Sequence, residues 1–245
     1  MGSDPSAIAR LDDVTVDYRG RRALGPISLA LAPGEIVALV GPSGCGKSTI
    51  LRLIAGLERP TAGEVSLVTG RGETSVVFQA PTLMPWASAT ANVSLPLELA
   101  GLNKTAARSR AKEVLARVKL PDKGQCKPAQ LSGGMAMRVA IARALVSDPK
   151  LLLMDEPFAA LDEITRRALA DDVLSLWSAS RPTIVFVTHN VEEAVYMAGR
   201  VLVMTSAPGR LAGSVTVEAP IPRPAGLRTS DVFRRSVEAV SQCLD

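Results

Sequence analysis

One segment of the chain carries the strongest signal, and it reads Gly41-Pro42-Ser43-Gly44-Cys45-Gly46-Lys47-Ser48-Thr49. It follows a run expected to be a strand, residues 35–40, and it opens a run expected to be a helix, residues 47–55. In that setting the segment matches the P-loop pattern. Its glycines let backbone amides point inward at phosphate oxygens, and the start of the helix adds a dipole that favours an anion. The segment predicts a site for the phosphates of a nucleotide.

Two pairs of side chains are predicted to act on that nucleotide. Lys47 would reach the β- and γ-phosphates, and the Ser48 hydroxyl would ligate Mg²⁺. An apolar run at residues 151–154 ends in Asp155 and Glu156, and open α/β sheets bind ligands at the carboxyl ends of their strands. We therefore expect Asp155 to hold the Mg²⁺ shell and Glu156 to orient or deprotonate the attacking water.

A third element lies between these two in the sequence. It reads Leu131-Ser132-Gly133-Gly134-Met135, and a helical pattern continues from it to residue 146. Ser132 is a good N-cap, and Gly133 and Gly134 leave the amides of the helix start uncovered. The segment predicts a second anion-binding helix start, although Ser-Gly-Gly alone is a common loop sequence.

The order of the elements favours an α/β fold with a mostly parallel sheet, because short β-type runs alternate with helical patterns. Three continuously apolar runs, residues 36–40, 151–154 and 184–187, suit central strands buried on both faces. Residues from about 80 to 148 lack strong strand signals and are expected to form a helical insertion. A proline-marked tail follows residue 206. Further strands are expected at residues 14–18, 64–68, 75–79 and 200–204, and further helices at residues 104–118, 133–146, 162–178, 191–197 and 231–240.

Composition narrows the class of protein. The formal charge is only +4 and aromatic residues make up 3% of the chain, whereas stacking surfaces for nucleic acids need aromatic side chains. No apolar run reaches the roughly 18 residues of a membrane helix, and Asp4 and Pro5 argue against a signal peptide. The three cysteines match no metal spacing and fit a reducing cytosol. We expect no nucleic-acid partner, and the lone His189 excludes a multi-histidine metal site.

Taken in order, the motifs resemble those of the ABC ATPase family from about Leu11 to Met204. The shared features are the P-loop, a Gln after a strand, the Leu-Ser-Gly-Gly signature, the Asp-Glu strand and a late His. The resemblance implies an ATP hydrolase with a P-loop NTPase fold: a RecA-like core with a mostly parallel sheet, an N-terminal antiparallel β subdomain and an inserted α-helical subdomain. It implies one domain over residues 1–245, with a catalytic core at about 1–85 and 149–205, a helical subdomain at about 86–148 and a tail at about 206–245.

Further site residues follow from the resemblance by position. Gln79 matches the Q-loop glutamine, which senses Mg²⁺ and the transmembrane partner, and Asp162 lies in the Ala-Leu-Asp segment that matches the D-loop. His189 matches the switch histidine that contacts the γ-phosphate. Tyr18 matches the aromatic that stacks on adenine, with an ordinary strand tyrosine as the alternative. The resemblance thus assigns catalysis to Glu156, His189 and Gln79, and Mg²⁺ to Ser48, Gln79 and Asp155.

The resemblance also implies that two copies of the chain act together. In the family two ATPase subunits face each other head to tail, so that Ser132 of each contacts the ATP held by the P-loop of the other. The sequence departs from the family at Met135, where the usual signature has Gln. Because the Ser and Gly donors remain, we expect activity to persist.

Three stretches resemble the ATPases of nitrate, sulfonate and taurine importers: residues 80–86, residues 158–166 and the tail motif at residues 220–224. This implies transmembrane permease subunits as partners, an extracytoplasmic solute-binding protein as an indirect partner, and a peripheral location on the cytoplasmic face of the inner membrane. Trp86 is expected either at the groove that receives a permease helix or in an ordinary core. The alternatives are an exporter ATPase and a soluble ABC ATPase, and the sequence does not identify the solute.

Overall fold

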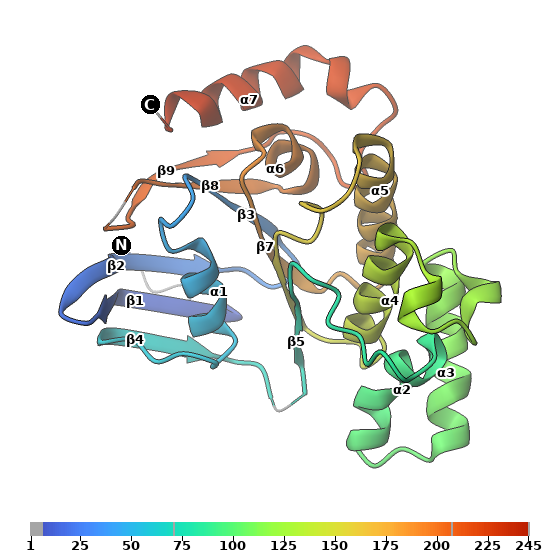
Figure 1. The fold of residues 1–245 in the computed structure, drawn as a ribbon. Helices are drawn as coiled ribbons and strands as arrows, with labels where there is room; N and C mark the ends of the chain where they lie inside the picture. The colour runs from blue at the N-terminus through green and yellow to red at the C-terminus, as the bar shows by residue number, and fades with distance from the viewer. Residues whose placement is uncertain (1–6, 71, 207, 245) are drawn as a thin grey trace.

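The computed structural model describes residues 7–70, 72–206 and 208–244 (Figure 1). Asp4 and Pro5, on which the expected lack of a signal peptide depends, lie outside the described residues. In the described part of the chain, no helix combines the length and the apolar character that crossing a bilayer requires.

A six-stranded sheet forms the centre of the fold, in the order β5-β6-β7-β3-β8-β9. Strands β3 (Ile36–Val40) and β7 (Thr183–Thr188) are buried along their whole length. All neighbouring strands are parallel except β9, which runs antiparallel to β8. A strand covered on both faces needs no alternation of polar residues, and this is why the continuously apolar runs predict central strands. The remaining strands are β5 (Thr74–Val77), β6 (Leu151–Asp155), β8 (Arg200–Met204) and β9 (Leu211–Thr216).

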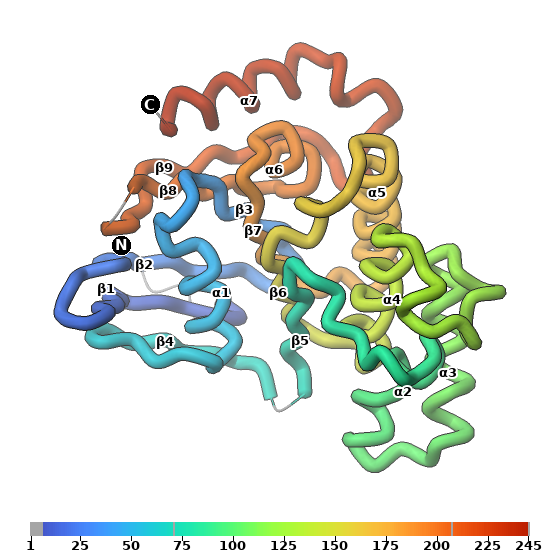
Figure 2. Tube along the Cα trace, in the orientation of Figure 1, coloured from blue at the N-terminus to red at the C-terminus, as the bar shows by residue number. Residues whose placement is uncertain are grey.

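A second, antiparallel sheet precedes it in the chain. Its middle strand β1 (Ala9–Tyr18) pairs with β2 (Arg21–Leu31) on one side and with β4 (Ala62–Leu67) on the other. Figures 1 and 2 show this sheet beside α1 (Lys47–Ile54), at the blue end of the chain. The predicted fold class, with a mostly parallel core sheet and an N-terminal antiparallel sheet, is confirmed.

Helices cover both faces of the central sheet. In Figures 1 and 2, α1 lies on the side of the N-terminal sheet, whereas α4 and α5 lie on the other side. Helices α2 and α3 pack against α4 and against each other, which gives the helical insertion expected before residue 148. The helices other than α1 are α2 (Ala89–Leu99), α3 (Lys104–Arg117), α4 (Gly133–Leu145), α5 (Glu163–Ser180), α6 (Val191–Met197) and α7 (Asp231–Gln242).

The central sheet divides two hydrophobic cores. Along β3, Ile36, Ala38 and Val40 face the core that α2 to α7 complete. The alternate residues Val37 and Leu39 face the core shared with α1 and the N-terminal sheet. Because the side chains of a strand alternate between its faces, this one short strand anchors both cores.

The sequence did not predict three elements, β2, β9 and α2, and it misplaced some ends. The strand expected at residues 75–79 ends at Val77, so Gln79 lies in the loop that follows. The strand expected at residues 14–18 begins earlier, at Ala9. Both differences concern the ends of elements, where tertiary pairing decides how far a strand continues.

Candidate functional site

Many of the predicted site residues lie at one edge of the central sheet. Four neighbouring parallel strands, β5, β6, β7 and β3, have their carboxyl ends there. The loop after β5 carries Gln79, the end of β6 carries Asp155 and Glu156, and the loop after β7 carries His189. The P-loop follows β3. Topology therefore gathers segments that are far apart in the sequence at the ligand-binding edge of an open sheet.

The P-loop needs glycine at two places for reasons that the structure makes visible. Gly46 is the N-cap of α1 and has φ +95°, which a residue with a side chain adopts only at a cost. A Cβ there would also lie 2.7 Å from Cδ1 of Leu24. A Cβ on Gly41 would lie 2.7 Å from the carbonyl oxygen of Met204. The loop is thus packed tightly on its inner side, while Ser43 and Gly44 are exposed on its outer side.

Lys47 lies at the centre of this loop. Its side chain is 5% exposed, and Nζ donates to the carbonyl oxygens of Gly41, at 2.8 Å, and Pro42, at 2.9 Å. Nζ also lies 3.8 Å from Sγ of the buried Cys45. The loop backbone therefore holds the ammonium group in place, beside the amides that would face phosphate oxygens.

Ser48, in the first turn of α1, and Asp155, at the end of β6, come together at this edge. The Ser48 hydroxyl donates to Oδ1 of Asp155 at 2.7 Å. A hydroxyl and a carboxylate supply the hard oxygen ligands that Mg²⁺ prefers. Among residues 7–70, 72–206 and 208–244 no group of three or more His, Cys, Asp or Glu side chains could hold a metal ion. The pair fits a Mg²⁺ that takes few protein ligands and completes its shell with phosphate oxygens and water.

Glu156 and His189 form the second contact at this edge. Nδ1 of His189 lies 3.3 Å from Oε2 of Glu156. Glu156 is half-buried and has φ +45°, in the left-handed region. A residue other than glycine is held there only when the surrounding structure requires it, and such residues cluster at functional sites. The backbone thus turns the carboxylate of Glu156 toward the loop after β7.

Glu193 belongs to this cluster, and the sequence analysis missed it. Burial raises the pKa of its carboxyl, and a hydrogen bond to Thr188 and the positive charge of Arg166 oppose that rise. It lines a small cavity together with Glu156, His189 and Arg166. The available signal was its place four residues before Met197 on the apolar face of a helix, which is an unusual position for an acid.

The start of α4 lies elsewhere. Ser132 is exposed and caps the helix, since its hydroxyl accepts from the amide of Met135 at 3.3 Å. A Cβ on Gly134 would lie 2.6 Å from Cγ2 of Thr165, so this helix start packs against the start of α5. In the described part of the chain, no hydrogen bond joins Ser132 to the P-loop. One chain does not bring its two predicted phosphate-binding elements together.

Asp162 caps the neighbouring helix α5. Its carboxylate accepts from the amide of Thr165 at 3.0 Å. Hydrogen bonds from Thr165 lower the pKa of the Asp162 carboxyl, so the residue is ionised at neutral pH. Asp162 and Ser132 therefore begin two adjacent helices, both with exposed caps.

Tyr18, Gln79 and Trp86 are also exposed. Tyr18 is 45% exposed at the end of β1, and its hydroxyl is hydrogen-bonded to the carboxylate of Glu58. Gln79 is exposed in its loop. Trp86 is 73% exposed, so the interpretation of this residue as an ordinary core aromatic is wrong.

The loop that carries Trp86 is held firmly at both ends. Nη1 and Nη2 of Arg143, on α4, donate to the carbonyl oxygens of Thr82, at 2.8 Å, and Pro81, at 3.0 Å. The side chain of Asn92, which is fully buried, accepts from the amide of Met84 at 2.7 Å and donates to three carbonyl groups of residues 84–88. An exposed tryptophan on an anchored loop is suited to contact another molecule.

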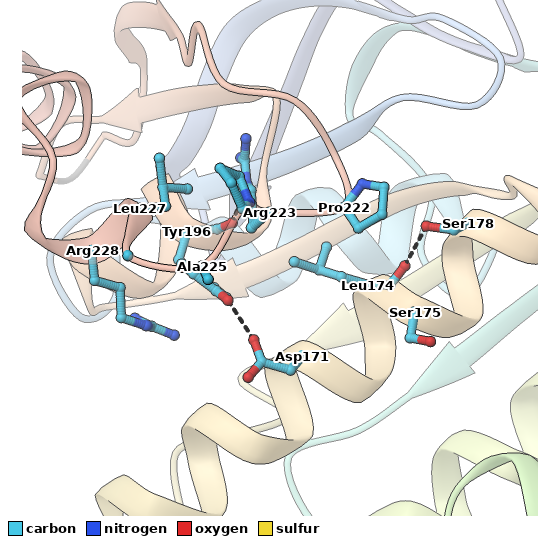
Figure 3. A pocket seen from close by; sticks show the side chains of 12 residues that line it. Asp171, Leu174, Ser175, Ser178, Tyr196, Pro222, Arg223, Ala225, Leu227 and Arg228 are labelled. Atoms are coloured by element: carbon cyan, nitrogen blue, oxygen red, sulfur yellow. Dashed lines mark hydrogen bonds between the residues drawn. The ribbon is translucent and has the colours of Figure 1, made fainter.

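A cavity lies away from this edge of the sheet. It has a volume of about 590 Å³ and lies between α5, Tyr196 of α6 and tail residues 222–228 (Figure 3).

The chain is similar to proteins of known class. Residues 24–159 match the family model described as "ABC transporter". A putative ATP-binding protein of Brucella abortus biovar 1 (strain 9-941) is 45% identical, over 91% of this chain and 87% of the relative. The aliphatic sulfonates import ATP-binding protein SsuB 1 of Xanthomonas axonopodis pv. citri (strain 306) is 47% identical, over 83% of each chain. The taurine import ATP-binding protein TauB of Yersinia pestis bv. Antiqua (strain Antiqua) is 44% identical, over 80% of this chain and 78% of the relative.

A solved structure agrees with these relatives. The dimeric ATP-binding cassette MJ0796, in a post-hydrolysis state bound to ADP and Pi, has a TM-score of 0.76 and 32% sequence identity. The match covers 86% of this chain and 100% of that one. The fold, the P-loop and the family match lead to one identification: the chain belongs to the ATP-binding proteins of ABC transporters, binds ATP and is an ATP hydrolase.

Proposed function

We propose that this ATPase energises an importer for a small solute such as a sulfonate, taurine or nitrate. The observation that carries the proposal is Trp86, an exposed aromatic on a loop anchored by Arg143 and Asn92. An exposed large aromatic on a held loop needs a partner, and a permease helix is the partner that the family resemblance supplies. The relatives whose names specify aliphatic sulfonate and taurine import support the solute class.

In the proposed mechanism the P-loop amides and Lys47 hold the triphosphate, and Tyr18 stacks on adenine. Glu156 orients the attacking water and accepts its proton, and His189 steadies both the Glu156 carboxylate and the γ-phosphate. The contact of 3.3 Å between Glu156 and His189 supports this arrangement. Gln79, in the loop after β5, would change position when nucleotide binds and so move the loop that carries Trp86.

Mg²⁺ is the proposed metal. Ser48, Asp155 and Gln79 would hold it, and the hydrogen bond between the Ser48 hydroxyl and Asp155 supports the first two. When bound, Mg²⁺ would neutralise charge on the β- and γ-phosphates. The orientation of the attacking water remains the task of Glu156.

A second copy of the chain is the other proposed partner. Ser132, Gly133 and Gly134 begin α4 with an exposed cap and make no hydrogen bond to the P-loop within the described chain. They would bind the γ-phosphate held by the other copy, with Asp162 beside them. The dimeric cassette MJ0796 supports this pairing.

Arg143 gives the proposed coupling a physical route. It lies on α4, the helix that Ser132 caps, and it donates hydrogen bonds to the loop between Gln79 and Trp86. A helix moves as one body, so closure of the Ser132 end over ATP would shift the loop that meets the permease. The enzyme would act as a peripheral subunit on the cytoplasmic face of the inner membrane, with a solute-binding protein as an indirect partner. The division into core, helical subdomain and tail stays part of the proposal.

The test reconstitutes the ATPase with its permease in liposomes and measures ATP-driven uptake. The binding protein is supplied with taurine, an alkanesulfonate or nitrate in separate experiments. We expect uptake of one of these, and we expect Trp86→Ala to impair uptake and complex assembly while the ATPase rate of the isolated subunit stays near wild type. Val68→Ala, at an apolar residue that is 76% exposed elsewhere, is the matched control. Export instead of uptake, or no association with a permease, would refute the importer assignment.

A further inference from the structure

The tail motif at residues 220–224 makes contacts that the proposed hydrolysis mechanism does not use. Its Arg223 is half-buried and reaches across to the main chain of another element. Nε donates to the carbonyl oxygen of Tyr196 at 2.6 Å, and Nη2 donates to those of Val195, at 3.2 Å, and Ala198, at 2.5 Å. Nη1 donates to the carbonyl oxygen of Ala219, in the tail itself, at 2.6 Å. One guanidinium group thus joins the tail to the end of α6.

The end of α6 needs this partner. The last carbonyl groups of a helix accept no hydrogen bond from within that helix. Residues 194–198 are also all buried, so water cannot supply the missing donors. A buried carbonyl without a hydrogen bond is costly, and a positive charge is favourable at a helix C-terminus. Burial lowers the pKa of Arg223 to about 10, so the group remains charged at neutral pH.

Two more contacts fix the same turn of the helix (Figure 3). The guanidinium carbon of Arg228, also in the tail, lies 3.5 Å from the centre of the Tyr196 ring. The hydroxyl of Tyr196 is hydrogen-bonded to the carboxylate of Asp171 on α5. The tail therefore clamps the end of α6 against a helix of the catalytic core.

The other end of α6 lies at the site. His189 comes directly before the N-cap Asn190, whose side chain accepts from the amide of Glu193 at 3.0 Å. The imidazole of His189 is largely exposed, and its one hydrogen-bond contact within the described chain is with Glu156. A helix of seven residues moves as a unit. The position of its C-terminal end therefore affects the position of His189 at its N-terminal end.

We propose that Arg223 is a positioning residue: by capping the end of α6 it holds that helix, and with it His189, where the imidazole meets Glu156. The proposal rests on the proposed role of His189 in hydrolysis. It assigns the tail motif an effect on the catalytic rate through a chain of contacts, without any contact between the tail and ATP.

The chain offers a direct readout, because His189 is its only histidine. In protein labelled with ¹³C and ¹⁵N histidine, the imidazole signals come from this residue alone. Arg223→Lys keeps the charge but lacks the planar fork that serves several carbonyls. Arg223→Ala removes both. The matched control is Arg234→Lys, at an exposed tail arginine whose ion-pair partner is Asp231 on the same helix.

We expect Arg223→Lys to shift or broaden the imidazole signals and to lower kcat for ATP by about three- to tenfold, in the range of coupling effects between distant sites. KM for ATP should stay within about twofold, because the contacts that the P-loop, Lys47 and Tyr18 are proposed to make with the nucleotide are unchanged. Arg234→Lys should leave the signals and both constants near wild type.

Each other outcome contradicts the proposal. Unchanged imidazole signals and kcat in folded Arg223 variants would show that the cap does not reach the site. An equal effect of Arg234→Lys would indicate a general effect of the tail, and failure of both Arg223 variants to fold would make Arg223 a folding residue. His189→Ala distinguishes the proposed role of His189 in hydrolysis from its proposed positioning by the tail. Full ATPase activity in that variant would refute the role of His189 in hydrolysis. A shift of the imidazole signals in Arg223→Lys would still support the positioning of His189 by the tail.

Discussion

The two helix starts that are proposed to bind phosphate differ in how many other segments surround them. At the start of α1, the P-loop lies beside the carboxyl ends of three other strands, and Ser48 contacts Asp155 within the same chain. At the start of α4, Ser132 is exposed and is bonded only to its own helix in the described chain. Both sequences predict an anion-binding helix start, although the signal of the second is weaker because Ser-Gly-Gly alone is a common loop sequence. The structure gathers Glu156 and His189, the residues proposed for catalysis, at the sheet edge of the first start.

The difference fits the proposed division of labour between two copies of the chain. In that proposal the edge at α1 binds ATP and activates water, and the start of α4 supplies donors to the ATP held by the other copy. The predictions below test this division, beginning with the largest expected effect.

Glu156→Gln should lower the ATPase rate by about 10²–10⁴-fold, the usual cost of losing a general base. ATP binding should persist, because Lys47 and the P-loop amides remain. Gel filtration of this variant should show a dimer with ATP that is weak or absent with ADP. Glu238→Gln, on the exposed face of α7, is the control. A variant that is inactive but monomeric with saturating ATP would break the division between the two helix starts.

Ser132→Arg should lower the ATPase rate by about 100-fold or more, since removal of one donor to a transition-state oxyanion has a cost of that size. The added side chain would also block the opposing P-loop. Met135→Gln is the matched control on the same turn, and it should remain within a few-fold of wild type in a steady-state assay. A large loss in Met135→Gln would show that the methionine, which packs partly against the core, has a specific role.

Tyr18→Ala should raise KM for ATP with little change in kcat. Stacking of a base on an aromatic ring is worth ~1–3 kcal/mol, which corresponds to roughly five- to 150-fold in affinity. Tyr18→Phe keeps the ring and loses only the hydrogen bond to Glu58, so its KM should stay near wild type. If the two variants behave alike in a nucleotide titration, stacking is not the role of Tyr18.

Glu193→Gln has the smallest expected effect, and it depends on pH. Below the ordinary glutamate pKa of about 4.3 the carboxyl is mostly neutral in both folded and unfolded chains. As the pH rises from there toward the raised pKa in the folded protein, the unfolded chain ionises more readily, and wild type loses stability relative to the variant.

The Tm of Glu193→Gln minus that of wild type should therefore increase by about 2–4 °C from about pH 5 to about pH 8, the shift expected for a change of about 1 kcal/mol. Calorimetry at several pH values measures this difference. Glu192→Gln, at the exposed neighbouring residue, should show no such trend. A difference that falls as the pH rises would contradict the burial of a neutral carboxyl at this position.

The residues gathered beside α1 stand out in the sequence because their signals are local. A P-loop, an apolar run ending in two acids and a run ending before His189 each carry their own pattern. The sheet then brings them together through a topology that three continuously apolar strands already indicate.

The missed elements have no comparable local signal. Strand β2 contains Gly25 and Pro26, which argue against a strand, but it lies at the edge of its sheet, where proline is tolerated. Helix α2 contains Pro96 and is held by its cap Ser88 and by packing against α3 and α4. Tertiary neighbours decided both elements.

The missed functional residues share another property. Glu193 and Arg223 are charged, and charged residues on helices or in tails usually face water. Glu193 is of interest because it is buried, and Arg223 because it donates hydrogen bonds to the backbone of another element, such as the one to Tyr196. No pattern of residue types records such a contact.

The order of the strands has a consequence for synthesis on the ribosome. The strand before the P-loop, β3, leaves the ribosome early, but its neighbours β7 and β8 are made much later. Ile36, for example, can pair only after Ile184 has been synthesised. The three-stranded N-terminal sheet can form well before that, because its pairing is more local. Until β7 emerges, β3 is an apolar segment without a partner, and such segments aggregate or engage chaperones. ATP stabilises only a chain that already has its site, so the nucleotide can assist the folding of this protein only after most of the chain has been made.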